Sequence, residues 1–146
     1  MVSLSGLPPE AIEQIPFDTI LIVEDDEDTC EMLTECIELE TSYRVLSFAD
    51  GNEALQHIEE IKEAHPFLFI LDLQLPILTG IQLYDSLHAL QELEHIPAII
   101  ITAATLKLEL ECAVAKRNLT LLLKPFDIAE LISSIERLLI SSGQLI

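Results

Sequence analysis

The sequence predicts an α/β fold of the (βα)5 type, in which five parallel strands form one doubly wound sheet. Five short apolar runs recur along the 146 residues. The segments between these runs have apolar residues at helical spacing. Strand–helix–strand units require parallel pairing with right-handed crossovers. Parallel strands are buried on both faces, which explains why the runs are continuously apolar.

The expected strands are, in chain order, Thr19–Val23, Tyr43–Phe48, Phe67–Leu71, Ala98–Thr102 and Leu119–Leu123. Four pairs with capping-box spacing predict the helix starts that follow. The pairs are Asp28 with Glu31, Asp50 with Glu53, Thr79 with Gln82, and Asp127 with Glu130. The last expected helix has a one-sided apolar stripe, formed by Ile128, Leu131, Ile132, Ile135, Leu138 and Leu139.

Two segments are less regular. Leu106–Glu111 alternates like a strand, but Leu106, Leu110 and Val114 also share one helical face, and the alternation of strands and helices favours a helix. Near the N-terminus, Pro8 could start a short helix that ends near Pro16. We expect an extension over residues 1–17, one domain over 18–141 and a tail over 142–146, with no output domain.

The charge limits the classes of partner. The chain has 7 Lys and Arg against 26 Asp and Glu, a net charge of −19. This argues against nucleic acid, which requires a basic surface, and against anionic membranes. Apolar stretches are too short to span a membrane, so no membrane insertion is expected. A protein partner should offer a basic or an apolar face.

Cysteines and histidines indicate no metal framework. The three cysteines, an odd number without a CxxC spacing, are expected to be thiols in a reducing cytosol and to pack as small hydrophobic residues. The four histidines form no HxxxH pair and are expected in surface or loop positions. With no targeting segment evident, the predicted localisation is cytoplasmic.

Polar side chains follow four of the five predicted strands. Glu24, Asp25 and Asp26 come after the first strand, and Asp72 comes after the third. Thr102 closes the fourth, and Lys124 follows the fifth. Taken singly, each has a plain structural explanation, such as a solvated loop acid, a turn cap or a surface lysine. Because ligands of open parallel sheets bind beyond the carboxyl ends of the strands, we expect one common site.

This set of groups suits phosphoryl transfer. Clustered carboxylates repel one another unless a cation lies among them, and Mg2+ is the hard cation that carboxylates hold. A carboxylate can accept a phosphoryl group as an aspartyl phosphate, stabilised by nearby charge. An ammonium and a hydroxyl group can then bind the phosphoryl oxygens.

The sequence resembles the receiver domain of two-component response regulators. The motifs that carry the resemblance are LIVEDD, FILDLQLPILTG, IIITAAT and LLLKPF, within residues 18–141. The spacings between Asp72, Thr102 and Lys124 also match those typical of the family. The resemblance implies a flavodoxin-like strand order of 2-1-3-4-5. It also implies a protein that catalyses only its own phosphorylation and dephosphorylation.

The resemblance implies a role for each site residue. Asp72 would be the phospho-acceptor. Mg2+ would be bound by Asp25 directly, by Glu24 mainly through water, by Asp72 and by the backbone carbonyl of Gln74. Asp26 would lie outside this set. Thr102 and Lys124 would bind the phosphoryl group, and the switch region would comprise Ala103, Leu121 and Pro125, with Pro125 after a cis peptide.

The implied partners are a histidine kinase or histidine phosphotransfer protein and a downstream protein effector. The last two helices and the last strand would form the surface that responds to phosphorylation, and a homodimer through the last two helices is one option. The expected first helix is acidic: from Glu24 to Glu40 there are nine acids and no Lys or Arg. This is either a solvated face or a docking surface for a basic partner.

Two departures from the family pattern leave alternatives open. Leu121 stands where receivers commonly have Tyr or Phe, and Lys116–Asn118 replaces a usual Gly-Ala turn. Leu121 supports a second interpretation, a non-switching interaction module. A third is an Mg2+-dependent phosphatase, although Gln74 stands where a second acid is usually needed. A flavin-binding module is a poor fourth, because the loop after Val23 is acidic.

Overall fold

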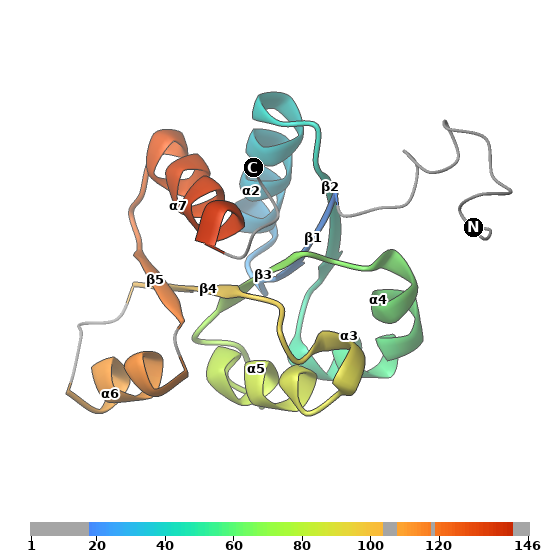
Figure 1. The fold of residues 1–146 in the computed structure, drawn as a ribbon. Coiled ribbons are helices and arrows are strands. Elements are labelled where there is room, and N and C mark those ends of the chain that lie inside the picture. The colour runs from blue at the N-terminus through green and yellow to red at the C-terminus, as the bar shows by residue number, and fades with distance from the viewer. Residues whose placement is uncertain (1–17, 104–107, 118, 142–146) are drawn as a thin grey trace, which may run out of the picture.

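The computed structural model describes residues 18–103, 108–117 and 119–141, shown in Figure 1. Five parallel strands form one sheet in the order β2-β1-β3-β4-β5. The strands are β1 (Thr19–Val23), β2 (Arg44–Phe48), β3 (Leu68–Asp72), β4 (Ala98–Thr102) and β5 (Thr120–Leu123). Both the (βα)5 fold class and the strand order implied by the resemblance are confirmed.

Three strands start one residue later than the sequence predicts, and β3 also ends one residue later. Tyr43 precedes β2 and packs its ring edge-on against Phe67, with the ring centroids 4.9 Å apart. The third strand includes Asp72, which pairs in register with Ile101 of β4. Asp72 is therefore the last residue of a central strand and not the first residue of a loop.

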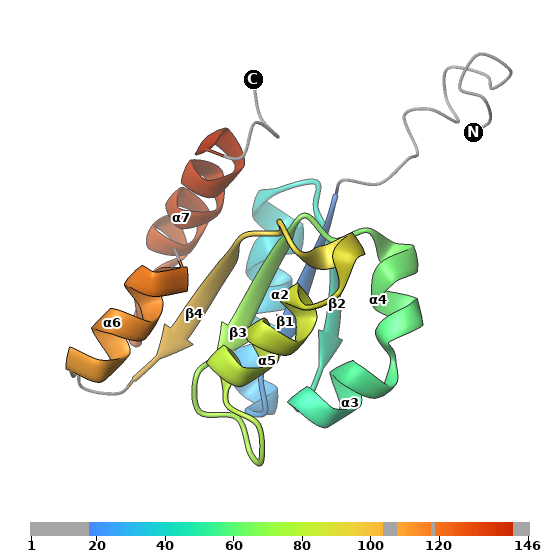
Figure 2. The same ribbon diagram turned by 60° about the horizontal axis from the view of Figure 1, so that its bottom comes forward.

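Helices cover both faces of the sheet, as Figures 1 and 2 show. Leu33 of α2 and Leu131 of α7 pack on one face, against side chains such as Ile22 and Ile70. Side chains from α3, α4 and α5 pack on the other face. The helices are α2 (Glu27–Glu40), α3 (Gly51–Gln56), α4 (Ile58–Ala64), α5 (Gly80–His88), α6 (Leu108–Arg117) and α7 (Ile128–Ser141), and a short 3-10 helix, η2 (Gln91–Leu93), precedes β4.

Three of the four predicted capping pairs are present at helix starts. Asp50 accepts from the Glu53 amide at 2.7 Å, and Asp127 accepts from the Glu130 amide at 2.8 Å. Thr79 forms a full capping box with Gln82. These side chains satisfy amides that lack a partner in the first helical turn.

The predicted cap of the first helix is wrong. Asp26, not Asp28, caps α2, because the Asp26 carboxylate accepts from the Thr29 amide at 2.9 Å. Asp28 lies inside the first helical turn. Only Glu24 and Asp25 separate the end of β1 from this cap.

The remaining helical predictions have mixed outcomes. The segment between β2 and β3 forms two helices, α3 and α4, joined at His57. The ambiguous segment is helical from Leu108, as the alternation of strands and helices favours, whereas Leu106 lies outside the described residues. The N-terminal helix predicted from Pro8, the extension and the tail also lie outside them.

Cysteine and histidine placement differs in part from the expectation. Cys30 and Cys36 are half-buried against the α2–α7 side of the core, but Cys112 is exposed on α6 and packs into no core. His88 is not a free surface residue. Its ring lies against Tyr84, and its Nε2 donates to the Ile96 carbonyl at 2.7 Å. Among the described residues, no helix is long and apolar enough to cross a membrane.

Candidate functional site

The polar strand ends predicted from the sequence meet at one edge of the sheet. Glu24 directly follows β1, Asp72 ends β3, Thr102 ends β4 and Lys124 directly follows β5. Because β1, β3, β4 and β5 are successive neighbours in the sheet, their carboxyl ends lie side by side. The fold thus brings Glu24 and Lys124 into contact across 100 residues of chain.

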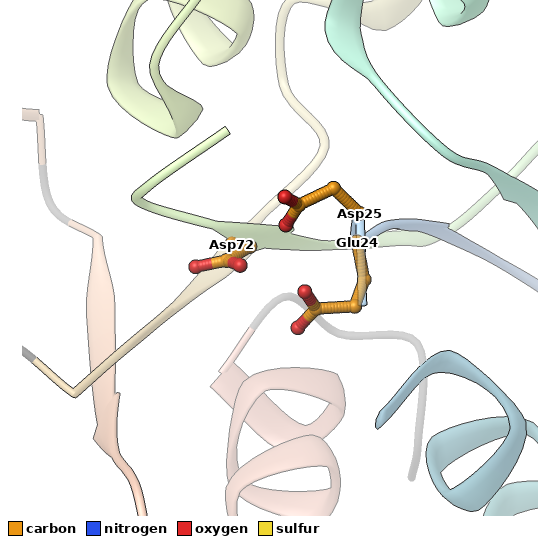
Figure 3. Close-up of side chains that lie close together, drawn as sticks. All are labelled: Glu24, Asp25 and Asp72. Carbon is orange, nitrogen blue, oxygen red and sulfur yellow. The ribbon is translucent and has the colours of Figure 1, made fainter. Parts of the chain in front are cut away.

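Three carboxylates form the centre of this edge. Glu24, Asp25 and Asp72 each offer an oxygen, and these oxygens lie within 4.8 Å of one another. Figure 3 shows the side chains of Glu24 and Asp25 extending toward Asp72. Glu24 and Asp72 are buried, with exposed fractions of 2% and 6%, whereas Asp25 is exposed. Oxygen ligands that are partly open to solvent match a hard divalent cation.

Both oxygens of Glu24 are engaged by the protein. Its Oε1 accepts from the Lys124 ammonium at 3.2 Å, and its Oε2 accepts from the Asp26 amide at 3.1 Å. Lys124 Nζ also lies 3.8 Å from Asp72 Oδ2. The Lys124 amide donates to the Thr102 carbonyl at 2.8 Å, which joins the ends of β4 and β5. Lys124 therefore bridges the two buried carboxylates.

The environment of Glu24 favours its protonated form. Burial, and after it the neighbouring Asp72 carboxyl group, raises the pKa of Glu24 from 4.5 to about 7. The Asp26 amide and Lys124 act in the opposite direction but do not cancel this effect. Near neutral pH, Glu24 can thus take up a proton, or its charge can be balanced by a bound cation.

Backbone contacts hold the peptide at Asp72. The Asp72 Oδ1 accepts from the Gln74 amide at 3.1 Å. The Leu73 amide donates to Ile101 of β4, and the Leu73 carbonyl accepts from the Gly80 amide at 3.0 Å. The role of the Gln74 carbonyl as a metal ligand remains a prediction.

The structure gives a physical reason for leaving Asp26 out of the ligand set. The Asp26 carboxylate accepts hydrogen bonds from both the amide and the hydroxyl of Thr29. These bonds lower the pKa of Asp26 and direct its side chain toward α2. Asp26 is a helix cap and does not belong to the carboxylate cluster.

Of the predicted switch residues, Ala103 and Pro125 lie beyond the ends of β4 and β5, whereas Leu121 lies inside β5. Thr102 is fully buried, and Ala103 after it is exposed. Pro125 is exposed and follows a cis peptide bond, as the resemblance implies. Leu121 is half-buried within β5, pairs with Ile100 and packs against the core on the α3–α5 side.

Two backbone features between β3 and α5 are not predicted from the sequence. Gly80 packs against the Asp72 backbone. The signal for this contact in the sequence is a glycine directly after a capping Thr, where alanine would favour the helix. Ile77 has a positive φ of 68°, and the residue is 87% exposed. Nothing in the sequence indicates this, because isoleucine is disfavoured there.

Comparisons with known proteins agree with this geometry. The family model described as the response regulator receiver domain matches residues 20–136. The chain is similar to the polar-differentiation response regulator DivK of Brucella ovis, with 35% identity over 89 residues, covering 61% of this chain and 69% of DivK.

Solved structures show the same fold. A CheY-like response regulator receiver domain protein from Methanospirillum hungatei superposes with a TM-score of 0.76 at 25% identity, covering 88% of this chain and 98% of that one. The chemotaxis response regulator CheY4 of Vibrio cholerae superposes with a TM-score of 0.73 at 22% identity, covering 84% and 99%. The likeness to CheY4 concerns the fold alone.

Proposed function

Because this chain belongs to the response regulator receiver domain family, we propose that it accepts a phosphoryl group on Asp72 and passes on a signal. The donor is the phosphohistidine of a histidine kinase or phosphotransfer protein. The observation that carries the proposal is the Glu24–Asp25–Asp72 cluster with Lys124 beside it. The signal then passes by contact with a protein effector or by onward phosphotransfer.

The carboxylate cluster fits Mg2+. Three carboxylate oxygens within 4.8 Å, two of them from buried side chains, form a hard-ligand site without sulfur or imidazole. The site would be formed by Glu24, Asp25, Asp72 and the Gln74 carbonyl. When bound, Mg2+ neutralises charge on the carboxylates and the transferred phosphoryl oxygens.

Asp72 acts as the nucleophile in this proposal. One of its carboxylate oxygens forms the bond to phosphorus while the bond from phosphorus to the donor histidine nitrogen breaks. The electron pair of that bond stays on the nitrogen, and the histidine departs as neutral imidazole because its other ring nitrogen already carries a proton in the donor. The end of a central strand holds Asp72 in place, because Leu73 directly after it hydrogen-bonds to β4. Little reorganisation of Asp72 is needed before attack.

Lys124 and Thr102 bind the new phosphoryl oxygens in this proposal. Lys124 Nζ is already 3.8 Å from Asp72 Oδ2. Its ammonium can shift from Glu24 toward an added phosphoryl group, which carries more charge than a carboxylate. Thr102 ends the neighbouring strand β4, and its movement toward the phosphoryl group would shift Ala103 directly after it.

The docking face for the donor is the exposed side of α2 in this proposal. Glu31, Glu35 and Glu38 are exposed there, and none of them forms an ion pair within the part of the chain that the structure describes. The last turn of α2 has no basic residue to complement its negative end. This charge fits a donor with a basic surface.

Leu121 favours a second candidate, a module of the same fold whose partner binding is unaffected by phosphorylation. A leucine packed against the core offers no aromatic ring that could change position. Comparing partner affinity before and after phosphorylation would separate the two functions.

The proposed function is tested by intact-mass spectrometry after incubation with Mg2+ and acetyl phosphate. We expect one added phosphoryl group on the native chain. We expect none on the Asp72→Asn variant and none when Mg2+ is removed with a chelator. A native chain that binds Mg2+ but takes up no phosphoryl group from acetyl phosphate or a phosphorylated kinase would refute the proposal.

A further inference from the structure

Gly80 lies against the backbone of the proposed phospho-acceptor. A side-chain Cβ built on Gly80 would lie 2.3 Å from the Asp72 carbonyl oxygen and 3.1 Å from Leu73 Cα. These are backbone atoms, which cannot move aside by changing a rotamer. Only a hydrogen atom fits between the first turn of α5 and the end of β3.

Helix formation does not explain a glycine at this position. Gly80 is the first residue of α5, after the Thr79 cap, and its backbone φ lies outside the left-handed range that favours glycine. Alanine would be the better residue for the helix alone. The close approach to Asp72 is the feature that requires glycine here.

The loop between β3 and α5 has little freedom to yield. At one end, the Leu73 amide is bonded to Ile101 and the Leu73 carbonyl to Gly80. Near the other end, the Leu78 amide donates to the Pro76 carbonyl at 2.6 Å. A Cβ on Gly80 would therefore displace either the Asp72 peptide or the first turn of α5.

We propose that Gly80 is a positioning residue for phosphoryl transfer to Asp72, an inference that rests on the proposed function. By admitting α5 to direct contact with the Asp72 carbonyl, it fixes the peptide that carries the nucleophile. The same contact fixes the start of the loop that carries the Gln74 carbonyl. Small displacements of reacting groups are costly in rate.

The test compares Gly80→Ala with Gly51→Ala. Gly51 is a matched control, because it is also a first helical residue after a capping side chain. The three nearest atoms that a Cβ on Gly51 would meet all belong to the Leu78 side chain, with Cδ2 at 2.9 Å and Cβ at 3.3 Å, and none of them is a backbone atom. Since the chain has no Trp, Mg2+ affinity is read from the amide NMR signals of residues 72–74.

We expect Gly80→Ala to weaken Mg2+ binding about tenfold and to slow phosphorylation by acetyl phosphate at saturating Mg2+ by about tenfold to a hundredfold. Both are measured well below the melting temperature, where loss of stability alone leaves them unchanged. Gly51→Ala should leave both within about twofold of the native values.

Native-like Mg2+ affinity and rate in folded Gly80→Ala would overturn the inference. If the native chain took up no phosphoryl group, the proposed function would fail. The role of Gly80 would then be decided by comparing the Mg2+ affinity of Gly80→Ala with the affinities of the native chain and Gly51→Ala. If Gly80→Ala did not fold, amide exchange on the native protein decides. Mg2+ should slow amide exchange at Gly80 at least severalfold and leave the exchange rate of Ala54 in α3 unaffected. If Mg2+ changed the exchange rates of the Gly80 and Ala54 amides equally, the inference would be overturned.

Discussion

The Lys124 ammonium lies 3.2 Å from Glu24 Oε1 and 3.8 Å from Asp72 Oδ2. The lysine is thus nearer to a proposed metal ligand than to the proposed phospho-acceptor. Glu24 is almost fully buried, so Lys124 compensates a charge that water cannot reach. This relationship makes the stability of the site depend on Lys124 before any phosphoryl group arrives.

We predict that Lys124→Met lowers the free energy of unfolding by about 2 kcal/mol at pH 8, because it leaves the Glu24 carboxylate without its charged partner. The same substitution should raise the pKa of Glu24 further. Chemical denaturation measures the first effect. Lys116→Met, at an exposed position of α6, is the control, and equal losses in the two variants would argue against the ion pair.

The raised pKa of Glu24 predicts a pH dependence of stability. The folded protein binds a proton with a pKa of about 7, against 4.5 for an ordinary Glu. Between these pH values the folded state holds more protons, so this group's contribution to stability is lost as pH rises from about 4.5 to 7. The difference in unfolding free energy between the native chain and Glu24→Gln should follow this course in Mg2+-free buffer, and a flat difference would contradict it.

Metal affinity should change with pH in the opposite direction. A bound cation requires Glu24 to be ionised, so Mg2+ affinity should increase with pH up to about 7 and then level off. Calorimetric titration at several pH values measures this. In Glu24→Gln the Mg2+ affinity should be lower, and its increase between about pH 4.5 and 7 should be largely absent. An equal increase in the native chain and in Glu24→Gln would assign the pH dependence to another group.

The corrected cap of α2 makes a further prediction. Asp26→Ala should cost about 1 kcal/mol of unfolding free energy, because two groups of Thr29 lose their acceptor. Asp26→Asn, which keeps an acceptor, should cost much less. Asp28→Ala separates the two candidate caps, because it should lower the free energy of unfolding less than Asp26→Ala does. A greater loss of unfolding free energy in Asp28→Ala would identify Asp28 as the cap.

The acidic face of α2 is tested by charge reversal. Glu31→Lys, Glu35→Lys and Glu38→Lys together should slow phosphotransfer from a phosphorylated histidine protein at least tenfold, because they repel a basic docking surface. Phosphorylation by acetyl phosphate should be unchanged. The control reverses Glu60, Glu63 and Glu94, which are exposed elsewhere. Unchanged protein-to-protein transfer in the α2 variant would leave a solvated face as the explanation.

The sequence predicts the fold well because the signals for it are local. Continuous apolar runs indicate strands, and the rules of parallel pairing then limit the topology. The cap of α2 was misplaced because Asp26 and Asp28 are equally good caps by residue type. Asp28 was chosen because Glu31 follows it at capping-box spacing, whereas in the structure the amide and the hydroxyl of Thr29 both donate to Asp26.

The strand ends were predicted to meet, and they do, but the contacts within the site could not be predicted. Glu24 and Lys124 are far apart in the chain, and spacing alone does not show that Lys124 lies closer to Glu24 than to Asp72. The contact of Gly80 with the Asp72 carbonyl depends on how closely α5 approaches β3. The chemical roles of Asp72, Thr102 and Lys124 remain predictions.

The central claim is that Asp72 receives the phosphoryl group. The most direct measurement treats the phosphorylated chain with borohydride, which reduces an aspartyl phosphate to homoserine, and locates the homoserine by peptide mass spectrometry. We predict homoserine at position 72 and unmodified aspartate at positions 25 and 26. Homoserine at position 25 or 26, or at no acidic residue, would contradict the account.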